Sequence, residues 1–183
     1  PDLLFSPSSI GQSATAGSRR GLYYVINGLK ESTIPPRYAL RGNVVSQALA
    51  DVCAGGETSG DALIGDYFSK KPLDCLGQID AVWGAEARNG CEKVREFIRG
   101  RFKEACLGTD DDWIRKVMVE APFVSPVYGL TGRADALRYD SPTAVLELKS
   151  GRWDVHNQTW QKTHECQPLF YGDVLFSSLG IDF

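Results

Sequence analysis

The chain has 183 residues, of which 43% are hydrophobic and 10% aromatic, and its formal net charge is −3. This composition predicts one soluble domain with a full core and excludes a disordered chain. No apolar run approaches the roughly 18 residues of a membrane-spanning helix, and no cleavable signal peptide opens the sequence. We therefore expect no membrane association.

The five cysteines show no Cys-x-x-Cys spacing. An odd number of cysteines without a pattern is typical of reduced thiols. We expect an intracellular protein, and the sequence does not distinguish cytoplasm from nucleus.

The first part of the chain predicts helices. Residues 5–29 begin with Pro7 in a first turn, and residues 40–52 form an amphipathic pattern with Val45, Leu49 and Val52 on the buried stripe. The glycine-rich residues 54–60 lack the Lys-Ser/Thr of a phosphate-binding loop, so they predict a connection.

Residues 61–107 predict further helix. Four apolar residues recur at helical spacing and indicate a core face: Val94, Phe97, Ile98 and Phe102. Five basic residues interleave with them: Lys93, Arg95, Arg99, Arg101 and Lys103. We interpret this basic face as solvated, and DNA binding is the alternative.

Residues 115–124 predict a strand that leads through Ser125-Pro126 into a β-hairpin. The preceding Asp110-Asp111-Asp112 predicts a cap or turn, because three adjacent side chains cannot all face one point. The hairpin comprises strands at 130–138 and 143–148, joined by turn residues 140–142.

The register of this hairpin gathers charged groups. If Tyr139 faces Thr143, then Asp135 lies opposite Glu147, and Lys149 shares a face with Glu147. Two carboxylates and an ammonium at one point suit metal-assisted hydrolysis of a phosphodiester with Mg²⁺ or Mn²⁺. The alternative is a surface hairpin with a cross-strand ion pair.

Residues 159–179 predict a helix after a polar break at 151–158. At helical spacing, His164, Gln167 and Tyr171 share one face. Pro168 would kink this helix or lie in its first turn, in which case His164 precedes the helix.

Three motifs in this order resemble the PD-(D/E)XK nucleases of the RecB-like branch. They are Gly-x-x-Asp at 132–135, Glu-x-Lys at 147–149 and Gln-x-x-x-Tyr at 167–171. Within that branch, residues 119–175 are most similar to the nuclease domains of flap-processing replicative helicase–nucleases. The resemblance is weaker over the first 60 residues and absent between the two parts.

The resemblance implies an α/β fold, with a small mixed β-sheet flanked by helices in a restriction-endonuclease-like core. We expect a single nuclease domain over 1–183, mainly helical at 1–110 and with the catalytic sheet and following helix at 111–183, excised from a longer chain. The implied function is metal-dependent hydrolysis of single-stranded or flap DNA in replication or repair, with a helicase domain or partner.

The resemblance also assigns roles to residues. Asp135, Glu147 and the Leu148 backbone carbonyl would hold the metal, Glu120 would be a further acidic ligand, and Lys149 would act on the attacking water. The residues implied in DNA binding are Gln167, Tyr171, His164, Arg19 and Arg20. A solvated basic face remains the alternative for the two arginines.

Two positions depart from the family pattern. Ser46 stands where relatives have a metal-binding His, so water would fill that contact. Gly17 stands where relatives have an iron–sulfur cysteine, and the positions of the other three cluster cysteines lie beyond Phe183, so we expect no iron–sulfur cluster. The alternatives are a CRISPR-adaptation-type exonuclease of the same branch and a non-catalytic DNA-binding module derived from this fold.

Overall fold

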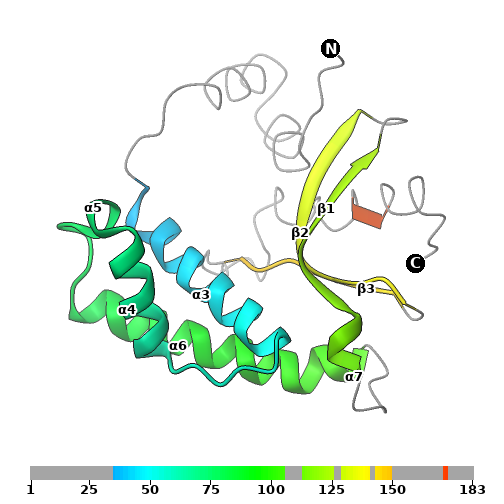
Figure 1. Ribbon diagram of the computed structural model, residues 1–183, viewed down its shortest axis with the longest axis horizontal. Coiled ribbons are helices and arrows are strands. Elements are labelled where there is room, and N and C mark those ends of the chain that lie inside the picture. Colours follow the sequence, from blue (N-terminus) through cyan, green and yellow to red (C-terminus); the bar gives the residue numbers. More distant parts are fainter. Residues whose placement is uncertain (1–34, 106–112, 126–128, 141–142, 150–170, 173–183) are drawn as a thin grey trace, which may run out of the picture. The chain divides into compact units, whose positions relative to one another are not determined.

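The computed structural model describes residues 35–105, 113–125, 129–140, 143–149 and 171–172 (Figure 1). The chain divides into two compact units. The helical unit comprises residues 32–119 and 138–144, and the strand unit comprises residues 1–31, 120–137 and 145–183. The expectation of a single nuclease domain stays a prediction.

The helical unit contains α3 (Arg37–Cys53), α4 (Gly60–Lys70), α5 (Pro72–Cys75) and α6 (Ala81–Phe97). A π-helix, η1 (Ile98–Phe102), then leads into α7 (Lys103–Ala105), and η2 (Trp113–Lys116) is a 3₁₀-helix. Helix α3 lies along α6, and α4 packs against both (Figure 1). The expected helices at 40–52 and within 61–107, and the expected connection at 54–60, are confirmed for the described residues. The helices expected at 5–29 and, apart from residues 171–172, at 159–179 lie outside the described residues.

Capping side chains fix where two of these helices begin. Ser59 accepts a hydrogen bond from the Ala62 amide at 3.2 Å, and Asp80 accepts one from the Trp83 amide at 2.7 Å. Asp80 also receives both terminal nitrogens of Arg37, at 2.6 and 2.8 Å. The hydrogen bonds from Arg37 and from Trp83 lower the pKa of Asp80 to about 2. These contacts tie the start of α3 to the start of α6.

The core of this unit lies between α3, α4 and α6, around Trp83, which is 1% exposed. On α3 both Val44 and Val52 are buried, while Val45 is only half-buried, so the prediction for Val45 was wrong. A Cβ on Gly90 of α6 would come within 2.7 Å of a Val45 methyl group. Val45 therefore packs beside the main stripe, where a glycine leaves space.

The prediction for the end of α6 needs two corrections. Val94, Ile98 and Phe102 are buried, but Phe97 is 38% exposed. The buried stripe continues at four-residue steps through the wide turn of the π-helix, which leaves Phe97 to one side. Arg95 is the second correction, because it is 6% exposed rather than solvated.

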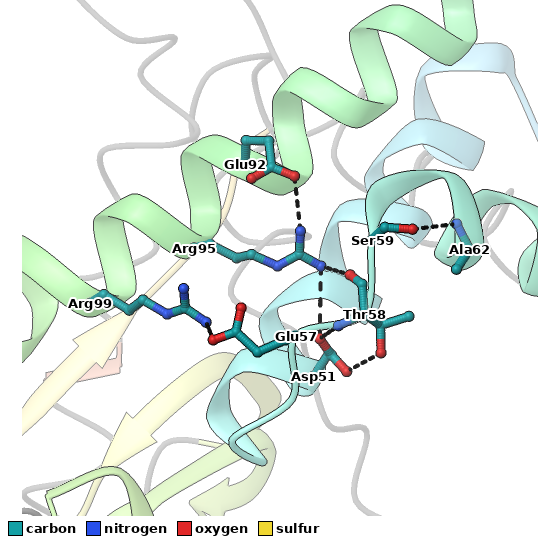
Figure 2. A network of polar contacts seen from close by, with 8 residues as sticks. All are labelled: Asp51, Glu57, Thr58, Ser59, Ala62, Glu92, Arg95 and Arg99. Carbon is teal, nitrogen blue, oxygen red and sulfur yellow. Dashed lines mark hydrogen bonds and ion pairs between the residues drawn. The ribbon is translucent and has the colours of Figure 1, made fainter.

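Arg95 is the centre of a polar network that holds the connection between α3 and α4 (Figure 2). Its guanidinium donates to the Thr58 carbonyl and to Glu92 (3.0 Å), and it lies 3.7 Å from the Asp51 carboxylate. Asp51 in turn accepts from the Thr58 amide at 2.9 Å and from its hydroxyl at 2.7 Å. A Cβ on Gly56 would come within 2.2 Å of the Asp51 carboxylate, so only glycine fits there.

The sheet has three antiparallel strands in the order β1 (Val117–Ser125), β2 (Leu130–Arg138), β3 (Ala144–Leu146). Strand β2 has the predicted bounds, and β1 is shifted by one or two residues. Strand β3 ends two residues early, because the Leu148 amide donates to the Asp135 side chain instead of a ladder carbonyl. Ala121, Leu137 and Val145 form a small core on the sheet.

A mixed helix-and-strand chain is thus confirmed. The described strands are antiparallel rather than mixed, and the PD-(D/E)XK core stays a prediction. Within the described ranges, no helix is long and apolar enough to cross a membrane. Cys75 and Cys91 are buried free thiols.

Candidate functional site

Strand β2 and the residues after β3 bring three predicted catalytic residues together. Asp135 Oδ2 accepts a hydrogen bond from the Leu148 amide, and Lys149 Nζ forms an ion pair with Glu147 Oε1. The side chains of Glu147 and Lys149 are 13% and 22% exposed, respectively. The hairpin therefore gathers these charges in a sheltered place, and their catalytic roles stay predictions.

Among the described carboxyl groups, Asp135 has a pKa raised above its ordinary value. Burial raises the pKa of Asp135 to about 6, against the opposing effect of the Leu148 amide. The charges of Glu147 and Glu120 raise this pKa further, and Lys149 lowers it. A further positive charge beside Asp135 would stabilise the ionised form of this carboxyl.

The two carboxylate oxygens of Glu147 are in different environments. Its Oε1 accepts a hydrogen bond from Lys149, whereas its Oε2 is buried and receives no well-aligned hydrogen bond from the described residues, although the Tyr171 hydroxyl interacts with the Glu147 carboxylate. A buried anionic oxygen without a donor is costly in free energy. Carboxylate oxygens are donor atoms that suit hard cations.

Glu120 lies at the level of Asp135, as expected from the sequence. It has a φ of 54°, and its carboxylate accepts from Arg133 Nη1 at 2.9 Å. Both side chains of this pair are exposed. The electrostatic effect of Glu120 on the Asp135 pKa places its charge near the same site.

Tyr171 is helical and only 2% exposed. Its hydroxyl donates to the Arg133 carbonyl at 3.2 Å, and its ring packs edge-on against Phe123 with the ring centroids 5.0 Å apart. Burial and the nearby carboxylates, Glu147 first, raise the pKa of Tyr171 well above its ordinary value. The neutral hydroxyl therefore anchors the β2 backbone beside Asp135.

Four expected site residues lie outside the described residues: Gln167, His164, Arg19 and Arg20. Ser46 lies half-buried on α3 in the helical unit. The assignments for these five positions stay predictions.

Sequence reasoning gave no role to Arg133, although it contacts two members of the site. The available signal was its spacing, because a residue two positions before Asp135 in a strand shares its face. Phe123 was missed for a different reason: its partner Tyr171 is 48 positions away, and no local pattern encodes that contact.

The described residues contain no group of three or more His, Cys, Asp or Glu side chains arranged to hold a metal ion. The donor atoms that fit a hard cation are the Glu147 Oε2 and the Asp135 carboxylate. Comparison of the chain with protein families, with characterised proteins and with solved structures found no match.

Proposed function

We propose that the chain is a divalent-metal-dependent deoxyribonuclease that hydrolyses phosphodiester bonds. The observation that supports this most is the buried Glu147 Oε2, which has no donor in the described part and lies in the same cluster as Asp135. Mg²⁺ or Mn²⁺ prefers such carboxylate oxygens. The choice of single-stranded or flap DNA rests on the motif resemblance.

Asp135 and Glu147 would hold the metal, with the Leu148 carbonyl and Glu120 as further oxygen donors. A bound divalent ion supplies a Lewis acid that acidifies water and neutralises charge on a phosphate. The Leu148 amide fixes the orientation of the Asp135 carboxylate through its hydrogen bond. The buried Tyr171 hydroxyl holds the β2 backbone two residues before Asp135.

Lys149 is the group that would act on the reacting atoms. Its ammonium is held beside Glu147 and only partly open to solvent. A compact cation there can hold a water or a phosphate oxygen by donating hydrogen bonds, and its charge stabilises negative charge that develops during hydrolysis.

The test combines a metal titration with a cleavage assay. We expect the wild-type protein to bind Mn²⁺ and to cut labelled single-stranded or flap oligonucleotides in Mg²⁺ or Mn²⁺, but not in EDTA. Asp135→Ala should lose metal affinity and lower the cleavage rate by about 10³-fold or more while it keeps its fold by circular dichroism. Asp61→Ala, which removes an exposed carboxylate paired with Arg88, is the matched control.

A non-catalytic DNA-binding module is the second candidate. The Lys149–Glu147 ion pair favours it, because that pair would equally stabilise a hairpin with no turnover. A protein that binds DNA but cuts none with any metal would establish this candidate. Full activity in EDTA or in Asp135→Ala would falsify the metal mechanism.

A further inference from the structure

Glu120 has a backbone conformation that its residue type disfavours. Its φ of 54° lies in the left-handed region, although it stands inside strand β1. For a residue with a Cβ this conformation is strained. Its exposed ion pair with Arg133 contributes little to stability, because solvent screens both charges. The pair therefore does not compensate for the strain.

Arg133 combines a fixed backbone with an accessible charge. Its carbonyl accepts from the Tyr171 hydroxyl, which is almost fully buried, while its own side chain is 64% exposed. It precedes Asp135 by two positions in β2 and so shares its face of the strand. Lys149, the other described cation of the strand unit, is 22% exposed and held by Glu147. Arg133 is thus the more accessible of the two.

We propose that Arg133 binds a backbone phosphate of the nucleic-acid substrate beside the acidic site. Glu120 positions and neutralises the guanidinium when no substrate is bound. This inference rests on the proposed function for the substrate class. A guanidinium has five donors in a planar fork, and the contact with Glu120 engages Nη1. The fork suits a phosphate, which it can bind through two parallel hydrogen bonds.

The acidic side chains near Arg133 explain why an exposed cation is needed beside them. Asp135, Glu147 and Glu120 repel a polyanion, and Lys149 already neutralises Glu147. A phosphate that approaches this face needs an exposed cation, and the carboxylate of Glu120 competes for the same guanidinium. Removing Arg133 should therefore weaken DNA binding, whereas removing the charge of Glu120 should strengthen it.

The experiment measures equilibrium binding of a fluorescent single-stranded oligonucleotide by anisotropy, in EDTA and at several salt concentrations. Arg133→Ala should lower the affinity by about three- to tenfold. It should also reduce the slope of log affinity against log salt by about 0.7, the value for one lost phosphate contact on a single strand. Glu120→Gln should raise affinity by about two- to fivefold at low salt, and the double variant should bind like Arg133→Ala.

The matched control is a second exposed arginine–carboxylate pair, Arg88 with Asp61, at 2.7 Å. Arg88→Ala and Asp61→Asn should leave affinity and salt slope unchanged. Glu120→Gly, which relieves the left-handed strain, should keep the melting temperature of the wild type and show the same gain in affinity as Glu120→Gln.

An unchanged affinity and salt slope in Arg133→Ala would overturn the phosphate contact. A loss of affinity in Glu120→Gln would overturn the competing role of Glu120. A cleavage assay of the wild-type protein in Mg²⁺ separates this inference from the proposed function. If the wild type cuts DNA but Arg133→Ala binds it as the wild type does, the inference alone is refuted. If Arg133→Ala binds DNA more weakly but the wild type cuts none, the hydrolytic function alone is refuted.

Discussion

Two clusters of charged side chains in this chain differ in how completely they are satisfied. In the helical unit, both oxygens of Asp51 accept hydrogen bonds from Thr58, and Arg95 contacts three acceptors (Figure 2). In the strand unit, Glu147 leaves its buried Oε2 without a donor and Asp135 has a raised pKa. In the first cluster every carboxylate oxygen of Asp51 has a donor, whereas in the second a buried carboxylate oxygen has none among the described residues.

The difference separates a structural network from a candidate site. The contacts of Arg95 all serve the chain, because they fasten the 54–60 connection to α3 and α6. Its Nε makes no hydrogen bond, but its two terminal nitrogens are engaged. The strand cluster instead retains anionic groups that destabilise one another. Perturbed and unsatisfied carboxylates of this kind concentrate at functional sites.

Within the strand cluster, the largest effect on activity is expected from substitution of Lys149. Lys149→Ala should slow single-turnover cleavage by about 10²- to 10³-fold, because it removes a charge that acts in the transition state. DNA affinity should stay within about threefold of wild type, since ground-state binding does not depend on that interaction. Lys149→Arg should also cut poorly, because a planar guanidinium does not replace a compact ammonium.

Lys70→Ala is the control for this prediction, because Lys70 forms an exposed ion pair with Asp66 in α4. It should leave both cleavage and binding unchanged. If Lys149→Ala instead binds DNA poorly but cuts at the wild-type rate, Lys149 is a phosphate clamp. The binding-module hypothesis would then gain support.

Local patterns predicted much of the fold. The 3.6-residue period marked α3 and α6, and the alternation of β2 gave its bounds exactly as observed. The burial predictions for Val45, Phe97 and Arg95 were wrong for local reasons. Each depends on a particular neighbour or on a local change of helix pitch, such as Gly90 opposite Val45 or the π-helix after Phe97. A periodic pattern does not contain that information.

The part of the candidate site that lies within the β-hairpin was predictable from the register of its strands. The proximity of Asp135 to the Glu147–Lys149 segment followed from turn position and strand spacing. The left-handed φ of Glu120 and the buried contact of Tyr171 with Phe123 did not follow from the register, because no local sequence pattern encodes either of them. The Arg133–Glu120 pair is intermediate: it joins neighbouring strands, so knowledge of the β1–β2 register would have revealed it.

The helical network offers a prediction of intermediate size. Arg95→Ala should lower the free energy of unfolding by about 3 kcal/mol, because it leaves the largely buried Asp51 carboxylate without its cation. Urea unfolding of the two proteins measures this difference. Arg88→Ala breaks an exposed pair from the same helix and should cost less than about 1 kcal/mol. Equal stabilities of the two variants would show that the network of Arg95 is no more structural than a surface pair.

The smallest expected effect is a gain in stability at the strand cluster. The pKa of Asp135 is raised to about 6 in the folded chain, so folding favours its protonated form. Stability from this group is therefore present below about pH 4 and is lost as the pH rises through about 6.

Asp135→Asn keeps an acceptor for the Leu148 amide without the charge. In EDTA at pH 8 it should be more stable than wild type by about 1–2 kcal/mol, a value discounted for solvent screening at this half-buried group. Urea unfolding between pH 4 and pH 8 checks this, with convergence of the two proteins expected at the acidic end. Superimposable stabilities at pH 8 would mean that the Asp135 carboxylate is as well satisfied as that of Asp51, and the contrast between the two clusters would fail.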